Sequence, residues 1–240
     1  MKEERFFYVP DAGNAEELPE QEAQHAVKVL RLSEGDPIWL IDGKGCFYQA
    51  EVGMANKKRC FYRILKALPQ EKTWRGSIHL AIAPTKMMER VEWMAEKATE
   101  VGFDGITFVD CKFSERHIVK TERIDKIVVS AVKQSRKAFM PHVVGMTPFA
   151  DFVSSCADDF KFIAHCYDDR PRVDLLDSLQ KLPANASVCV LVGPEGDFST
   201  DEVQQALAHG FQPVTLGNSR LRTETAGLMA VTMAQLVKRI

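Results

Sequence analysis

Short apolar runs alternate with helical stripes over the last two thirds of the chain. Five runs of five to seven residues have this character: 78–83, 106–110, 160–166, 187–193 and 212–217. Their composition is typical of strands that a parallel sheet buries on both faces. Apolar residues at helical spacing lie between and after them, in 87–101, 124–132 and 228–236. Strands alternating with helices predict an α/β domain with a mainly parallel sheet.

The first seventy residues have a different pattern. Four segments rich in aromatic and β-branched residues are separated by turn residues: FFYV, PIWLID, CFYQAEVG and RCFYRILKAL. One helical pattern, Glu20 to Leu32, interrupts them. Several strands and one helix in so short a segment predict a small β-barrel. The polar segment Leu68 to Ser77 breaks the periodicity, so we expect two domains, 1–72 and 73–240.

Composition narrows the class of protein. Hydrophobic residues make up 45% and charged residues 27% of the chain, as in ordinary globular proteins. No apolar run is long enough to span a membrane, and the N-terminus MKEERFFYVPDAG is charged where a signal peptide is apolar, which predicts a cytoplasmic protein. The six cysteines are scattered without a CxxC pair, which predicts neither a disulfide nor a metal site. Only ligands from distant positions could form a metal site, and nothing in the sequence suggests one.

The charges are unevenly distributed. The net charge of −2 argues against a nucleic-acid partner. However, residues 112–142 hold eight Lys and Arg against three acids, whereas residues 151–178 hold seven Asp against three bases. A basic run of this kind is usually a solvated helix face, and it is also what a phosphate-binding surface requires.

Two glycine-bearing turns stand between an apolar strand and a helix. Residues 193–199 read GPEGDFS and residues 216–226 read LGNSRLRTETA. Ligands of parallel sheets gather at the carboxyl ends of the strands, and glycine allows close backbone approach. Helix capping by Ser199 or Thr200 explains part of the first turn but not Pro194 and Glu195. We expect the two strands to be neighbours, so that these turns form one small-ligand site. The GxGxxG and P-loop motifs are absent.

These turns resemble the S-adenosylmethionine-binding motifs of the SPOUT methyltransferases. The resemblance is closest to the RsmE family, which methylates N3 of one uridine in small-subunit ribosomal RNA. It extends to HAVKVLRLSEGD (25–36), EKATEVG (96–102) and KQSRK…P (133–141), and so to nearly the whole chain. The sequence departs from the family at Asp197, where a glycine is usual, and at Asn218-Ser219, where Pro-Arg is more common.

The resemblance implies a PUA-like, RNA-binding β-barrel (1–72) and a SPOUT α/β domain with a C-terminal trefoil knot (73–240). It also implies a cytoplasmic homodimer that uses S-adenosylmethionine to methylate the decoding region of 16S rRNA, within the small subunit. The expected cofactor contacts are Leu191, Gly193, Pro194, Glu195, Gly196, Leu216, Gly217, Leu221, Thr225 and Ala226.

The chemistry of this reaction indicates which side chains matter. N3 of uracil must lose a proton, and a positive group would stabilise the charge that develops on O2 or O4. Arg222 and Arg136 are the candidates, with Arg220 a weaker one; Glu224 would orient an arginine or balance the sulfonium. For each arginine, a surface ion pair is the alternative. No residue is identified as the base.

N3 lies on the Watson–Crick edge, so the target base must be unpaired or flipped out. Basic residues would then contact the RNA backbone: His25, Lys28, Arg31, Arg116, Lys133 and Lys137. Two alternatives stay open. One keeps the fold and cofactor but methylates a ribose hydroxyl or a guanine; the other is an RNA-binding module without catalysis, which cofactor binding would exclude.

Overall fold

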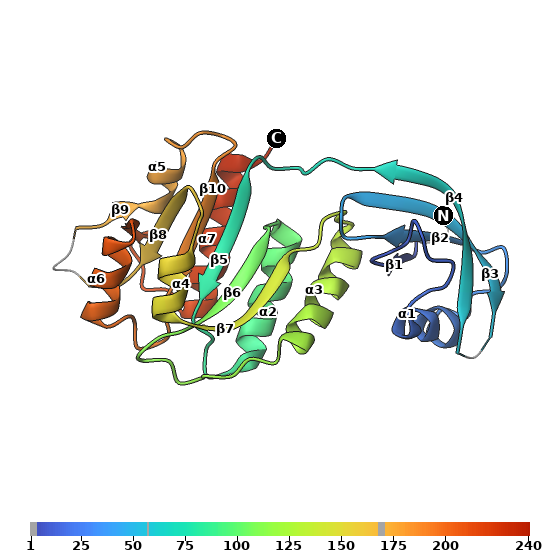
Figure 1. Ribbon diagram of the computed structural model, residues 1–240, viewed down its shortest axis with the longest axis horizontal. Coiled ribbons are helices and arrows are strands. Elements are labelled where there is room, and N and C mark those ends of the chain that lie inside the picture. The colour runs from blue at the N-terminus through green and yellow to red at the C-terminus, as the bar shows by residue number, and fades with distance from the viewer. Residues whose placement is uncertain (1–3, 57, 168–170) are drawn as a thin grey trace. The chain divides into compact units, whose positions relative to one another are not determined.

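The computed structural model describes residues 4–56, 58–167 and 171–240. The chain divides into two compact units (Figure 1). The first consists of Met1–Lys72 with Val129–Met140, and the second of Thr73–Val128 with Pro141–Ile240. The expected division also begins a second domain at residue 73, but it leaves the segment 129–140 in that second domain.

Backbone hydrogen bonds explain why this segment groups with the first unit. The Met140 amide donates to the Gly43 carbonyl (2.9 Å), and the Gly45 amide donates to the Ala138 carbonyl (3.0 Å). Such partners are distant in sequence, so periodicity within the segment does not reveal them.

The first unit is built on a four-stranded sheet with the order β1-β2-β3-β4. Strands β1 and β2 are parallel, and the other pairs are antiparallel. Its elements are β1 (Phe6–Tyr8), α1 (Glu20–Gln24), the π-helical turn η1 (His25–Val29), β2 (Pro37–Ile41), β3 (Cys46–Ala55) and β4 (Cys60–Pro69). Side chains including Phe7, Ile38 and Leu40 form its core. The predicted strands are present, and the predicted helix 20–32 is shorter because Arg31 has a φ of +52°.

The second unit has a seven-stranded sheet with the order β7-β6-β5-β10-β8-β11-β9, in which every pair is parallel. Its strands are β5 (Ser77–Ile82), β6 (Gly105–Asp110), β7 (His142–Pro148), β8 (Phe160–Ala164), β9 (Val173–Asp174), β10 (Ser187–Val192) and β11 (Phe211–Thr215). The predicted α/β class with a parallel sheet is confirmed.

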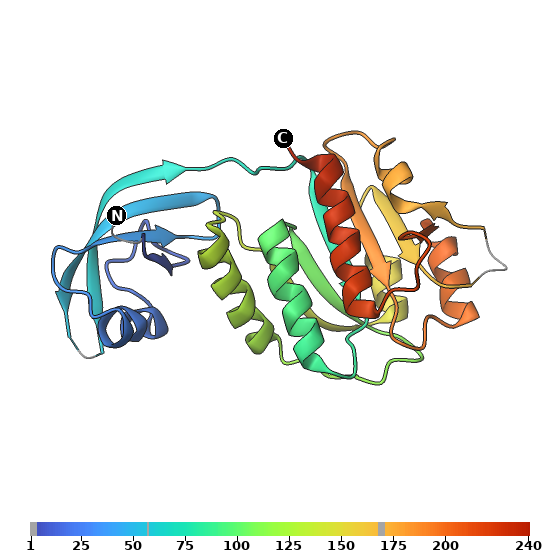
Figure 2. The ribbon, with the colours of Figure 1, turned by 180° about the vertical axis from the view of Figure 1, so that it is seen from behind.

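Helices cover both faces of this sheet (Figures 1 and 2). The helices are α2 (Met88–Val101), α3 (Thr121–Ser135), α4 (Phe149–Ser155), α5 (Leu175–Leu179), α6 (Thr200–Ala208) and α7 (Thr223–Lys238). Helices α2 and α7 pack against each other on one face, and α4 and α6 lie on the other. Helix α3 extends across the division between the units. In the described part of the chain, no helix is long and apolar enough to cross a membrane.

Local sequence determines where two of these helices begin. Ser199 caps α6 with a reciprocal capping box: its hydroxyl accepts from the Glu202 amide, and the Glu202 carboxylate accepts from the Ser199 amide. This confirms the predicted cap. Helix α7 begins after Arg222, whose side chain makes no capping bond. Of the polar residues at the start of α7, Glu224 pairs with Arg90 (3.7 Å).

Candidate active site

The carboxyl ends of three parallel strands meet in the second unit. Strand β8 lies between β10 and β11, and Ala164 at its end is in register with both Val192 and Val214. The expectation that the two glycine-bearing turns follow neighbouring strands is therefore wrong. Sheet order depends on long-range pairing, which the spacing of apolar runs does not encode. The consequence is that the end of β8 contributes to the site between the two turns.

Two adjoining cavities lie over these strand ends. They measure about 700 Å³ and about 400 Å³. Five residues line both: Ala164, Cys166, Arg220, Leu221 and Ala226. Shared walls of this kind make the cavities two compartments of one site, with space for a ligand of nucleoside size.

Most of the predicted cofactor contacts line this site. The larger cavity includes Leu216, Gly217, Leu221 and Ala226, and the smaller one includes Gly193, Pro194, Glu195, Leu221 and Ala226. The described linings do not contain Leu191, Gly196 or Thr225. Leu191 is wholly buried in the core below the site.

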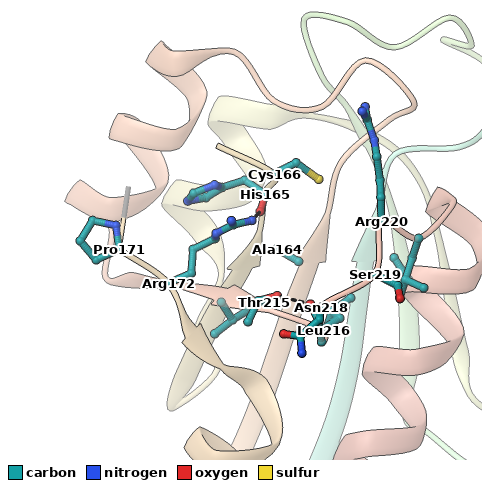
Figure 3. Close-up of a pocket in the computed structure, with 14 residues that line it drawn as sticks. Ala164, His165, Cys166, Pro171, Arg172, Thr215, Leu216, Asn218, Ser219 and Arg220 are labelled. Carbon is teal, nitrogen blue, oxygen red and sulfur yellow. Dashed lines mark hydrogen bonds between the residues drawn. The ribbon is translucent and has the colours of Figure 1, made fainter. Parts of the chain in front are cut away.

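The larger cavity contains residues that the sequence did not single out. Figure 3 shows Arg172 extending towards His165, with Thr215 and Asn218 on another side. The Arg172 guanidinium donates to the His165 carbonyl oxygen (2.7 Å). The polar pair His165-Cys166 directly follows the apolar β8, which is the signal that could have identified this third loop.

The smaller cavity is lined by charged residues of both signs. Arg90, Arg220 and Arg222 face it together with Glu195 and Glu224. The Glu224 carboxylate is largely buried and lies 3.7 Å from the Arg90 guanidinium, whereas Arg220 and Arg222 are exposed. The structure thus brings Arg222 and Glu224 into one cavity, and adds Arg90 as the ion-pair partner of Glu224.

Glu195 fixes the first glycine turn to a neighbouring loop. Its carboxylate accepts a hydrogen bond from the Lys86 amide (3.0 Å). The same loop is bound by Arg116, whose guanidinium donates to the carbonyl oxygens of Thr85 (3.2 Å) and Lys86 (2.6 Å). Arg116, predicted to contact RNA, therefore also supports the loop that Glu195 binds.

Asp197 takes the backbone conformation that a glycine would adopt. Its φ is +64°, in the left-handed region that aspartate tolerates better than most residues. Its carboxylate accepts hydrogen bonds from the amides of Cys166 and Phe198, both at 2.8 Å. The departure from the family pattern thus retains the shape of the turn and links it to the end of β8.

This geometry predicts an unusual order of stability for substitutions at Asp197. Asp197→Gly loses both hydrogen bonds but adopts the positive φ freely, whereas Asp197→Ala loses the bonds and keeps the strain. We expect the alanine variant to be less stable than the glycine variant by about 1 kcal/mol, and both to be less stable than the parent. Urea denaturation measures the difference.

Asp201 provides the matched control, because it is an exposed aspartate with helical backbone in the first turn of α6. There the order should reverse, with Ala about 1 kcal/mol more stable than Gly. The same order at both positions would contradict the role given to the backbone of Asp197.

The remaining predicted residues lie in the first unit. The Arg136 guanidinium pairs with Glu4 (2.7 Å) and lies 5.3 Å from the centre of the Phe6 ring. Lys133 forms a largely buried salt bridge with Glu22 (2.8 Å). Burial lowers the pKa of Lys137. Lys28 and Arg31 are exposed, and His25 is half-buried. The predicted roles of these residues in catalysis or RNA binding stay predictions.

Sequence comparison assigns the family. The sequence profile described as an RNA methyltransferase domain matches residues 72–235. The chain belongs to the RNA methyltransferase family. A second profile, described as an RNA methyltransferase PUA domain, matches residues 18–65. The predicted membership and the predicted PUA-like N-terminal part of this methyltransferase are confirmed.

Known relatives match this methyltransferase over most of its length. A Porphyromonas gingivalis protein described as a probable rRNA methyltransferase has a crystal structure that is 40% identical, with a TM-score of 0.90 over 98% of both chains. Ribosomal RNA small subunit methyltransferase E from Neisseria gonorrhoeae, crystallised with S-adenosylmethionine, is 27% identical, with a TM-score of 0.84 over 98% of both chains. The enzyme of the same name from Synechocystis sp. is 29% identical, over 85% of this chain and 67% of its own.

Proposed function

We propose that this protein is an S-adenosylmethionine-dependent methyltransferase that modifies N3 of one uridine in the decoding region of 16S rRNA. The observation that carries the proposal is the joint lining of two adjoining cavities by the loops 193–197 and 216–226, whose sequences resemble the family's cofactor motifs. Relatives named ribosomal RNA small subunit methyltransferase E support the substrate class.

The residues at the site fit S-adenosylmethionine. Leu216, Leu221 and Ala226 offer apolar surface for an adenine ring, and the backbone at Gly193 and Gly217 is accessible from the cavities. Glu195 and Glu224 provide negative charge that suits a sulfonium. When bound, the cofactor supplies an electrophilic methyl group, and the protein's own contribution is orientation and electrostatics.

Arg222 would act on the uracil. It is exposed at the start of α7 and faces the smaller cavity, so its guanidinium is available to a base that enters from solvent. A guanidinium near O2 or O4 stabilises the negative charge that develops as N3 loses its proton. Arg220 lines both cavities and would hold the cofactor or the RNA backbone.

Glu224 would position neighbouring groups of the site and would not itself take part in the methyl transfer. Its carboxylate is buried beside Arg90, and this ion pair fixes both side chains at the edge of the smaller cavity. The carboxylate also lines the smaller cavity, where it would balance the positive charge of the sulfonium. No residue of the site is assigned as the proton acceptor.

RNA binding would involve both units. We propose His25, Lys28, Arg31, Lys133 and Lys137 as contacts of the PUA-like unit, and Arg116 as one of the second unit. The proposal also includes Arg136 as a residue that contributes to catalysis. As the family resemblance implies, we further propose that the second unit contains a trefoil knot and that the protein is a homodimer. Its substrate would be the assembled small subunit.

Reverse transcription tests the proposal. Small subunits from cells that lack this protein are incubated with the purified enzyme and S-adenosylmethionine, and stops are mapped along the 16S rRNA. An N3-methyl group blocks base pairing, so we expect one new stop at a uridine of the decoding region. No stop, together with measurable cofactor binding, would reject the proposed target. No stop and no cofactor binding would reject the enzyme.

A further inference from the structure

A second cluster of reactive side chains lies towards the amino ends of the parallel strands. His79 is the third residue of β5 and Cys189 the third residue of β10, and the two are direct neighbours in register. Asp158 precedes β8, and Cys156 ends α4. The proposed methyl transfer uses none of these four residues, because its cavities lie over the carboxyl ends of the strands.

The distances between the donor atoms suit a tetrahedral cation. Asp158 Oδ2 lies 3.3 Å from His79 Nδ1 and 3.6 Å from Cys156 Sγ. The donor atoms of His79, Asp158 and Cys189 all lie within 4.8 Å of one another. Zinc bonds of about 2.0–2.3 Å place tetrahedral ligands roughly 3.3–3.8 Å apart. The two measured pairs already satisfy this spacing, and a shift of about 1 Å or less would bring Cys189 Sγ into the same range of His79 and Asp158.

The surroundings orient the donors. His79 Nε2 lies 2.9 Å from the hydroxyl of Thr107, a contact that leaves Nδ1 directed at Asp158. Partners of this kind typically fix the ligating nitrogen of a metal-binding histidine. Cys189 is wholly buried, and the side chains of His79 and Asp158 are 27% and 15% exposed. A cation would reach the cluster from the side of these two residues.

The cluster holds two free thiols, of which Cys156 is half-buried and Cys189 is buried. Two sulfur donors, one imidazole and one carboxylate favour zinc over magnesium or calcium, which prefer oxygen ligands.

We propose that His79, Cys156, Asp158 and Cys189 bind one zinc ion. Four protein donors close the coordination, so the site is structural and not catalytic. It joins the starts of β5 and β10 to the segment between α4 and β8. A ligand that binds only the folded chain raises its melting temperature. Because the donors come from three segments that lie far apart in the sequence, the cysteine spacing does not reveal the site.

Metal titration of the full chain tests this site. The protein is purified with a chelator and a phosphine reductant, dialysed, and titrated with Zn²⁺ and then with Co²⁺ as a spectroscopic probe. We expect one ion per chain, a higher melting temperature, a thiolate-to-cobalt charge-transfer band and the visible bands of a tetrahedral site. An absence of stoichiometric binding would overturn the proposal.

Substitutions locate the ion. Cys156→Ser, His79→Gln and Asp158→Asn should each weaken Zn²⁺ binding about tenfold or more. Cys46→Ser and His209→Gln, outside the cluster, should leave it unchanged. The melting temperature without metal shows that each variant folds, and the Asp158 variant is the mildest change. Binding that survives all three cluster substitutions would overturn the proposal. Since metal binding is measured without RNA or cofactor, the outcome is independent of the proposed methyl transfer.

Discussion

Arg222→Ala is expected to lower kcat for RNA methylation about 100- to 1000-fold, the usual cost of removing one donor that stabilises developing negative charge. The affinity for S-adenosylmethionine should change little, because the side chain is exposed at the cavity edge and is proposed to contact the uracil. Isothermal titration gives the cofactor affinity, and single-turnover methylation of small subunits gives the rate.

Arg239 is the matched control, an exposed arginine at the other end of α7. Arg239→Ala should retain the parental rate and affinity. Equal losses of rate and cofactor affinity in Arg222→Ala would place this arginine among the cofactor contacts, contrary to the role proposed for it.

Gly217→Val is expected to weaken S-adenosylmethionine binding roughly 10- to 100-fold, from a backbone strain of about 1–3 kcal/mol. Gly217 has a φ of +112°, lines the larger cavity, and its carbonyl accepts a hydrogen bond from the Thr215 hydroxyl (2.7 Å). A β-branched residue disfavours this conformation, so the loop would rearrange away from the shape that the cavity requires. Equilibrium binding of the cofactor measures the loss.

Gly35 is the matched control for Gly217, because it separates the effect of backbone strain from the effect of a changed loop at the site. It also has a positive φ (+85°) and, as at Gly217, a Cβ added there would meet no atom within 4 Å, but it belongs to the first unit. Gly35→Val should lower stability without changing cofactor affinity. If both variants weakened binding equally, or neither did, the 216–226 loop would not be the cofactor loop.

The amino-acid pattern predicts the central strands of the second unit's sheet well and its two edge strands poorly. Strands β5, β6 and β10 are buried along most of their length, and β8 and β11 still hold short apolar runs, so composition identifies all five. Strand β7 is an edge strand in which exposed and half-buried residues prevail, and it was not predicted. Strand β9 has only two residues, too few for a periodic signal.

For the site too, short motifs predict some residues, whereas others depend on long-range strand pairing. The motifs identified Gly193, Gly217 and Glu224, because each lies in a short segment of characteristic composition. Cys166 and Arg172 were missed, since they join the site only through the position of β8 between β10 and β11. The proximity of His79 and Cys189 likewise depends on strand register.

The most direct test of the central claim identifies the methylated atom. Small subunits from cells that lack this protein are incubated with the enzyme and isotopically labelled S-adenosylmethionine, and the rRNA is digested to nucleosides for mass spectrometry. The proposed function predicts label in 3-methyluridine alone, and none with the Arg222→Ala variant on the same timescale. Label in a ribose-methylated nucleoside or in a methylguanosine would contradict it.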